Sequence, residues 1–206
     1  MPRLPLVPTL VVGLAVAAMI ALGVWQLERR TEKNAALALY AANLARPPMA
    51  FPRIPVGDTN LFRRATALCL EVTGWRHEGG RASDGTVGWR QIAECRTGAE
   101  GPLLRVDMGV TRAPGFRPDW KGGPVAGTIT HAPDHQPLIV SLFAKTPKPL
   151  MLVSDTAAPG LSPTARPALS SVPNNHLAYA VQWFLFAGVA VVIYALALRR
   201  RMIGKP

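Results

Sequence analysis

Two long apolar stretches without charge bracket a middle region in which short apolar runs alternate with turn residues. Leu10–Val24 carries no charge, and with the three residues before Thr9 about 19 positions are available, near the ~20 that cross a bilayer. Leu177–Leu198 adds 22 uncharged residues, closed by three arginines. A cleavable signal peptide is the alternative for the first stretch, but no small-residue cleavage pattern follows it before Glu28. We predict two transmembrane helices.

The middle region predicts a β-rich domain. Gly and Pro residues recur along it and interrupt regular helices. A helix is expected only at Thr31–Leu44, continuing the first span. Ala157–Pro173 is rich in Pro and Ser and predicts an extended connector back to the membrane. Strands are expected at Thr66–Thr73, Val87–Cys95, Leu103–Val110, Val125–Thr130, Pro137–Phe143 and Leu150–Val153, and turns at Gly79-Gly80, Asp84-Gly85, Gly122-Gly123 and Pro133-Asp134.

The predicted fold class is therefore membrane α+β, with a hairpin of two transmembrane helices flanking a small antiparallel β domain, either a barrel or a sandwich. By the positive-inside rule, Arg199–Arg201 stays in the cytoplasm, so the middle region is expected in the periplasm. The segments are a cytoplasmic N-terminus (1–9), a first transmembrane helix (10–27), a periplasmic domain (28–175), a second transmembrane helix (176–198) and a basic cytoplasmic tail (199–206).

The net charge of +11 invites a nucleic-acid interpretation, but its distribution argues against one. Five of the basic residues lie outside 28–175, and the 18 basic and 12 acidic residues within that region are scattered without a run. No zinc-finger or RNP-type signature accompanies them. Nucleic acid is therefore not expected as a partner.

Polar residues at the start of the second span are the first candidates for chemistry. His176, Tyr179 and Trp183 fall at i, i+3 and i+7 on one helical face, and Gln182 lies on another. A neutral imidazole at this depth could bind iron or a hydrogen-bond donor, and the aromatic faces could sandwich a porphyrin. The alternative is an interfacial aromatic belt in which His176 merely starts the helix.

The outer end of the first span carries a matching set. Arg29 and Lys33 share a helical face with Trp25 or Gln26, where they could pair with the propionates of a porphyrin. The alternative is anchoring at the interface by Trp and by snorkelling Arg.

Other candidate groups lie in the middle region. His131, Asp134 and His135 could form a metal site, but Pro133 prevents a regular helix, so a solvated loop is expected. His77 is expected at the surface. Cys69 and Cys95 fall in predicted strands, and whether they form a disulfide is not decided by the sequence.

Motifs at both ends resemble those of the Surfeit locus protein 1 family. The middle agrees through Val72-Thr73-Gly74, Gly88-Trp89 and Val125-Ala126-Gly127, whereas many members read V-N-R-G-W where this chain has Val106-Asp107-Met108-Gly109-Val110. The N-terminal motif of the family, L-G-x-W-Q-x-x-R-x-x-x-K, is matched by Leu22-Gly23-Val24-Trp25-Gln26-Leu27-Glu28-Arg29-Arg30-Thr31-Glu32-Lys33. The C-terminal motif, N-N-H-L-x-Y-A-x-Q-W-F, is matched by Asn174-Asn175-His176-Leu177-Ala178-Tyr179-Ala180-Val181-Gln182-Trp183-Phe184.

The resemblance implies a bacterial inner-membrane assembly factor for heme-copper (aa3-type) cytochrome c oxidase, not an enzyme. It implies binding of heme a and its delivery to subunit I, with heme a synthase as a further candidate partner. His176 carries over as the axial ligand of the heme iron, and the other motif positions carried over are Trp25, Gln26, Arg29, Tyr179, Gln182 and Trp183. The alternatives are a structural chaperone that stabilises subunit I without binding heme, and a periplasmic metal-dependent hydrolase using His131 and His135.

Overall fold

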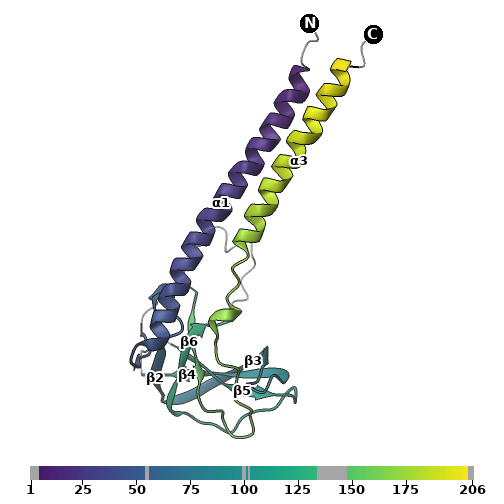
Figure 1. The fold of residues 1–206 in the computed structure, drawn as a ribbon. Helices are drawn as coiled ribbons and strands as arrows, with labels where there is room; N and C mark the ends of the chain where they lie inside the picture. Colours follow the sequence, from purple (N-terminus) through teal and green to yellow (C-terminus); the bar gives the residue numbers. More distant parts are fainter. Residues whose placement is uncertain (1–4, 54–55, 99–100, 102, 134–147, 204–206) are drawn as a thin grey trace. The chain divides into compact units, whose positions relative to one another are not determined.

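The computed structural model describes residues 5–53, 56–98, 101, 103–133 and 148–203. The chain forms two compact units, one made of its two ends (up to Ala36 and from Val172) and one of Leu37–Ser171. The elements are α1 (Leu6–Ala45), β1 (Met49–Ala50), η1 (Gly57–Asn60), β2 (Arg64–Cys69), β3 (Glu71–Arg81), β4 (Val87–Arg96), β5 (Leu104–Thr111), β6 (Gly123–His131), β7 (Leu150–Ser154), η2 (Leu169–Ser171) and α3 (His176–Ile203) (Figure 1).

The first unit is an antiparallel pair of helices. Thr9 near the start of α1 contacts Tyr194 near the end of α3, with the two hydroxyl oxygens 2.5 Å apart. At the other end of the pair, Gln26 contacts His176. The predicted helix after the first span is confirmed, because α1 runs without a break through Thr31 to Ala45.

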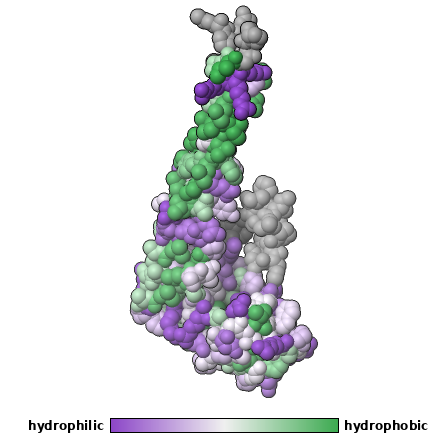
Figure 2. Space-filling model, turned by 45° about the vertical axis from the view of Figure 1, so that its right-hand side comes forward, coloured by the Kyte–Doolittle hydropathy of each residue, from purple (hydrophilic) through white to green (hydrophobic). Residues whose placement is uncertain are grey.

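Both helices are long and apolar enough to cross a membrane. In α1 the uncharged stretch ends at Glu28, two residues after Gln26, and in α3 it begins at His176. Since Gln26 and His176 are in contact, the two apolar stretches end at the same level. Figure 2 shows hydrophobic side chains covering the paired helices between hydrophilic bands. The hairpin of two apolar helices predicted from the sequence is confirmed.

The second unit is built on one sheet of seven strands, in the order β1-β2-β6-β7-β5-β4-β3. The described strands form a single sheet, not the two sheets of a sandwich. Most neighbouring strands are antiparallel, as predicted, but β1 pairs with β2 and β5 with β7 in parallel, so the sheet is mixed. Strand β7 inserts between β6 and β5, and such non-consecutive pairing is not encoded in the local pattern.

One predicted strand is in fact two. Residues 66–73 were expected as one strand, but β2 ends at Cys69 and β3 begins at Glu71. The reason is a change of partner: β2 pairs with β6, whereas β3 pairs with β4. The expected strands at 87–95, 103–110, 125–130 and 150–153 are confirmed as β4, β5, β6 and β7, and residues 137–143 lie outside the described residues.

The predicted turn at Gly79-Gly80 is wrong. Both glycines lie within β3, opposite Trp89 and Gly88. A Cβ on Gly80 would lie 2.2 Å from Cγ of Arg90, so this glycine accommodates a side chain from the neighbouring strand. The turn lies instead at Asp84-Gly85, which was also predicted, and there Asp84 accepts a hydrogen bond from the Thr86 N–H.

A disulfide joins Cys69 at the end of β2 to Cys95 near the end of β4. Both cysteines are almost fully buried. Next to the bridge, the Leu70 N–H donates to the Arg96 carbonyl, so the bend between β2 and β3 is held against β4 by both bonds. The pairing that the sequence left open is therefore present.

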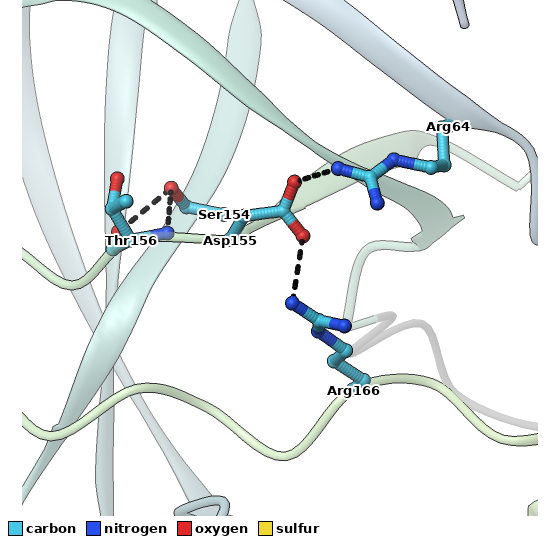
Figure 3. Close-up of polar contacts among 5 residues, drawn as sticks. All are labelled: Arg64, Ser154, Asp155, Thr156 and Arg166. Carbon is cyan, nitrogen blue, oxygen red and sulfur yellow. Dashed lines mark hydrogen bonds and ion pairs between the residues drawn. The ribbon is translucent and has the colours of Figure 1, made fainter.

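The connector after β7 is extended, as predicted, and it is also bound to the sheet. Backbone hydrogen bonds join Val110 to Ser162 in both directions, and Ala158 and Ala165 donate to Met108 and Arg81. Asp155 adds ion pairs to Arg64 in β2 at 2.5 Å and to Arg166 in the connector at 3.7 Å (Figure 3). The connector is thus part of the β unit, which extends to Ser171.

The last turns of α1 are anchored in the β unit. The fully buried Asn43 side chain donates to the carbonyls of Thr59 and Leu61, which flank the end of η1. One turn earlier, the Tyr40 ring packs against Phe62 with the ring centroids 5.2 Å apart.

Candidate functional site in the helix pair

The two helices contact each other along stripes of small and polar residues. On α3 the most buried positions are Ala180 and Ala187, seven residues apart, with Trp183 half-buried between them. On α1 Gly23 is buried, and a Cβ there would lie 2.5 Å from the Phe184 ring. Small side chains at these positions allow close approach of the two helix backbones.

His176 is positioned by a residue from the other helix. Its Nδ1 lies 2.8 Å from Oε1 of Gln26, and the contact is partly buried. A carboxamide oxygen can only accept, so the imidazole donates its Nδ1 proton in this hydrogen bond. The second ring nitrogen, Nε2, then carries the lone pair that can bind a metal ion.

The residues before His176 hold the start of α3. The side chain of Asn174 donates to the Asn34 side chain on α1 at 2.8 Å. The Asn175 carbonyl accepts the hydrogen bond of the Tyr179 N–H, which begins the helical pattern. Nothing in the sequence pattern distinguishes Asn34, which is recognised only by its place opposite Asn174 in the helix pair.

Trp25 and Arg29 share a face of α1, one of the arrangements expected from their spacing, and they also contact each other. The guanidinium carbon of Arg29 lies 5.4 Å from the centre of the Trp25 ring, a cation–π arrangement. Arg29 also forms an exposed ion pair at 2.7 Å with Glu32, three residues later on the same helix. Trp25 is 44% exposed, so its ring presents an apolar surface at the end of the span where His176 lies.

The other cationic candidate, Lys33, lies on a different part of the α1 surface. It is half-buried, as are Gln26 and Arg30, and the three recur at i, i+4 and i+7. Lys33 therefore shares its helical face with Gln26, one of the two arrangements expected. This brings two basic residues onto the face that carries the contact to His176.

The three remaining predicted residues on α3 are divided between two surfaces. Trp183 lies on the stripe that faces α1 and contacts Phe186 edge-to-face, with centroids 6.2 Å apart. Tyr179 is 51% exposed, and Gln182 is exposed as well. The common face expected from the spacing thus holds for His176 and Trp183, and Tyr179 lies beside it.

The histidine candidates in the β unit have simpler surroundings. His131 Nε2 lies 2.8 Å from Asp58 Oδ1, and His77 is exposed, as predicted. Asp134 and His135 lie outside the described residues. Within the part of the chain that the structure describes, no cluster of three potential metal-binding side chains occurs.

Fold and site together define a class: a protein with two helices apolar enough to span a membrane, a β-rich domain between them in the sequence, and a histidine held at one end of the helix pair. The sequence matches the SURF1 family over residues 13–188, so the chain belongs to this family of cytochrome oxidase assembly factors, as its terminal motifs suggested. Assembly rather than catalysis is the family's role. A search of curated proteins found no match.

Proposed function

We propose that this protein binds heme a at the His176 end of its helix pair and assists its insertion into subunit I of an aa3-type cytochrome c oxidase. The contact between Gln26 and His176 is the observation that carries the proposal. It ties together the two terminal motifs of the family, and it leaves an imidazole nitrogen free to bind iron. Heme is here the cargo of an assembly factor.

The donor chemistry of these residues fits heme. A neutral imidazole whose Nδ1 donates to an oxygen acceptor is a common axial ligand for heme iron. In this chain the acceptor is an uncharged carboxamide, which increases the basicity of the ring less than a carboxylate does. Such a ligand suits a cargo that must be released, and we propose that His176 is the only axial ligand from the protein.

The surrounding residues fit the two halves of the cargo. The exposed aromatic surfaces of Trp25 and Tyr179 are suited to an apolar ring system, with Trp183 and Gln182 as further candidate contacts. Arg29 can form charge-assisted hydrogen bonds with propionates in the headgroup region. A propionate would then replace Glu32 as the partner of the Arg29 guanidinium. The farnesyl tail of heme a belongs in lipid beside the apolar stretches.

We further propose that the β unit faces the periplasm of a bacterial inner membrane, with both termini in the cytoplasm. The arginines at the end of α3 support this orientation by the positive-inside rule. The disulfide between Cys69 and Cys95 supports it independently, since disulfides persist in oxidising compartments such as the periplasm. His176 would then lie at the outer surface of the membrane.

A structural chaperone is the second candidate. Trp25 and Tyr179 are 44% and 51% exposed, and aromatic rings of this kind can also pack on the helices of subunit I. In that case the protein would stabilise subunit I without holding heme itself. Heme a synthase is a further proposed partner, as the source of the cargo.

Expression with a heme a synthesis system but without oxidase subunits tests the proposal. The purified wild-type protein should carry heme a, seen in its visible spectrum. His176→Ala should remain in the membrane fraction without heme, whereas the control His77→Ala, which alters an exposed histidine of β3, should retain it. A colourless wild-type protein would refute heme binding and favour the structural chaperone. A full heme band in His176→Ala would refute the ligand assignment.

A further inference from the structure

In the hydrogen bond between His176 and Gln26 the ring nitrogen Nδ1 donates and the amide oxygen accepts, which the sequence motifs alone do not reveal. We propose that Gln26 is the positioning residue that selects Nε2 of His176 as the iron-binding atom, so that the heme site is completed only when the two helices are paired. This inference rests on the proposed function and names a second residue on which the same site depends.

The first support is the identity of the atoms in contact. Oε1 of Gln26 lies 2.8 Å from Nδ1, and this oxygen accepts the proton of that nitrogen. An imidazole with its proton fixed on Nδ1 presents Nε2 as its only lone pair. Without this acceptor, the proton would be distributed between the two nitrogens and the ring would be free to rotate.

The second support is where the two residues lie. Gln26 belongs to α1 and His176 is the first residue of α3, 150 positions later in the chain. At the first residue of a helix no preceding turn restricts the side-chain rotamer, so the ring orientation depends on contacts with neighbouring elements. Gln26 supplies such a contact from the opposite helix.

The third support is the packing next to the contact. Gly23 lies one turn before Gln26, and Ala180 lies one turn after His176, and both are buried. These small residues let the two helices approach closely enough for a short amide side chain to reach the ring. A helix pair that separates would lose the hydrogen bond, and with it the preference for Nε2.

Loss of such a partner hydrogen bond usually weakens metal binding by about 10–100-fold. We therefore expect Gln26→Leu, which has similar size and no acceptor, to bind heme a about 10–100-fold more weakly than the wild type. Gln26→Glu keeps an oxygen acceptor and should bind at least as well as the wild type. Because a carboxylate donates more electron density through the ring, Gln26→Glu should also lower the reduction potential of the bound heme.

Titration of the detergent-solubilised full-length apoprotein with heme a, followed by absorbance, measures these affinities. The matched control is Thr9→Val, which removes the contact to Tyr194 at the other end of the helix pair without touching the site. It should bind heme a within twofold of the wild type. Nitrogen-15 NMR of labelled histidine in the apoprotein provides a readout without heme, because the His176 signal should show protonated Nδ1 in the wild type and a mixture of tautomers in Gln26→Leu.

The outcomes separate this inference from the proposed function. If the wild type binds heme a and Gln26→Leu binds it equally well, the role of Gln26 is refuted while heme binding stands. Equal losses in Gln26→Leu and Thr9→Val would also refute it, because general helix packing would then account for both. If the wild type does not bind heme a at all, the proposed function itself fails.

Discussion

Asp107 and Thr164 are hydrogen-bonded across the β unit, with the Thr164 hydroxyl 2.7 Å from Oδ1 of the carboxylate. Asp107 lies in β5 and is fully buried, whereas Thr164 belongs to the connector that leads to α3. The Gly109 N–H donates to the same oxygen at 3.1 Å, and Arg90 lies 3.4 Å from the other one. A buried carboxylate thus holds the connector on the sheet.

This carboxylate makes the stability of the protein depend on pH. Burial raises the pKa of Asp107 above its ordinary value of 3.8, and the opposing effects of Arg90, Thr164 and Gly109 do not offset this. Between pH 3.8 and its raised native pKa, Asp107 therefore keeps a proton in the native state that it has lost in the unfolded chain. The stabilisation from this proton is complete below pH 3.8 and is lost as the pH rises through the raised native pKa.

We predict that Asp107→Asn, which keeps a polar side chain of similar size but cannot titrate, removes this pH dependence. Relative to the variant, the wild type should become less stable as the pH rises from 4 towards neutrality. Thermal unfolding in detergent across this range measures the difference. Asp119→Asn, at a carboxylate 86% exposed, is the control and should follow the wild type. Parallel pH curves for the wild type and Asp107→Asn would contradict the prediction.

Removal of the disulfide should destabilise the β unit. Replacing both Cys69 and Cys95 by Ser releases a loop with a sequence separation of 26 residues. The expected loss in the free energy of unfolding is about 2–4 kcal/mol, because the unfolded chain regains loop entropy. Denaturant unfolding measures it, and reduction of the wild type should give a similar loss while leaving the double variant unchanged.

Asn43 is expected to be essential for holding the last turns of α1 within the β unit. Asn43→Ala would leave the carbonyls of Thr59, in a partly buried position, and of Leu61, in a buried one, without their donor, at a cost of about 1–3 kcal/mol. Asn60→Ala, at a half-buried residue of η1, provides the comparison and should cost less. The melting temperatures of the two variants test the prediction, and an equal decrease in both would contradict it.

Two glycines of α1 offer a matched test of helix pairing. An added side chain at Gly23 would collide with the Phe184 ring, whereas a Cβ at Gly13 would meet nothing within 4 Å. Gly23→Ile should therefore separate the helices and lower the melting temperature of the detergent-solubilised protein, and Gly13→Ile should not. A similar melting temperature for both variants would mean that close packing at Gly23 does not hold the pair together.

The sequence alone predicted the elements whose signal is local. An uncharged stretch such as Leu177–Leu198 is recognised as a membrane helix because hydropathy is a sum over neighbouring residues. The strands β4 to β7 follow from short apolar runs, and the terminal motifs named the family. The break at Leu70 was missed because two strands with different partners read as one apolar run.

Only the tertiary structure decided which distant residues meet. Gln26 lies opposite His176, Cys69 is bonded to Cys95, and the connector binds the sheet through residues such as Ser162. Each of these contacts depends on how whole elements pack. The packing energy comes from residues far apart in the sequence, so no short segment predicts it. The sequence thus determined that a histidine begins the second apolar helix, and the pairing of the helices determined that Nδ1 of this histidine contacts Gln26.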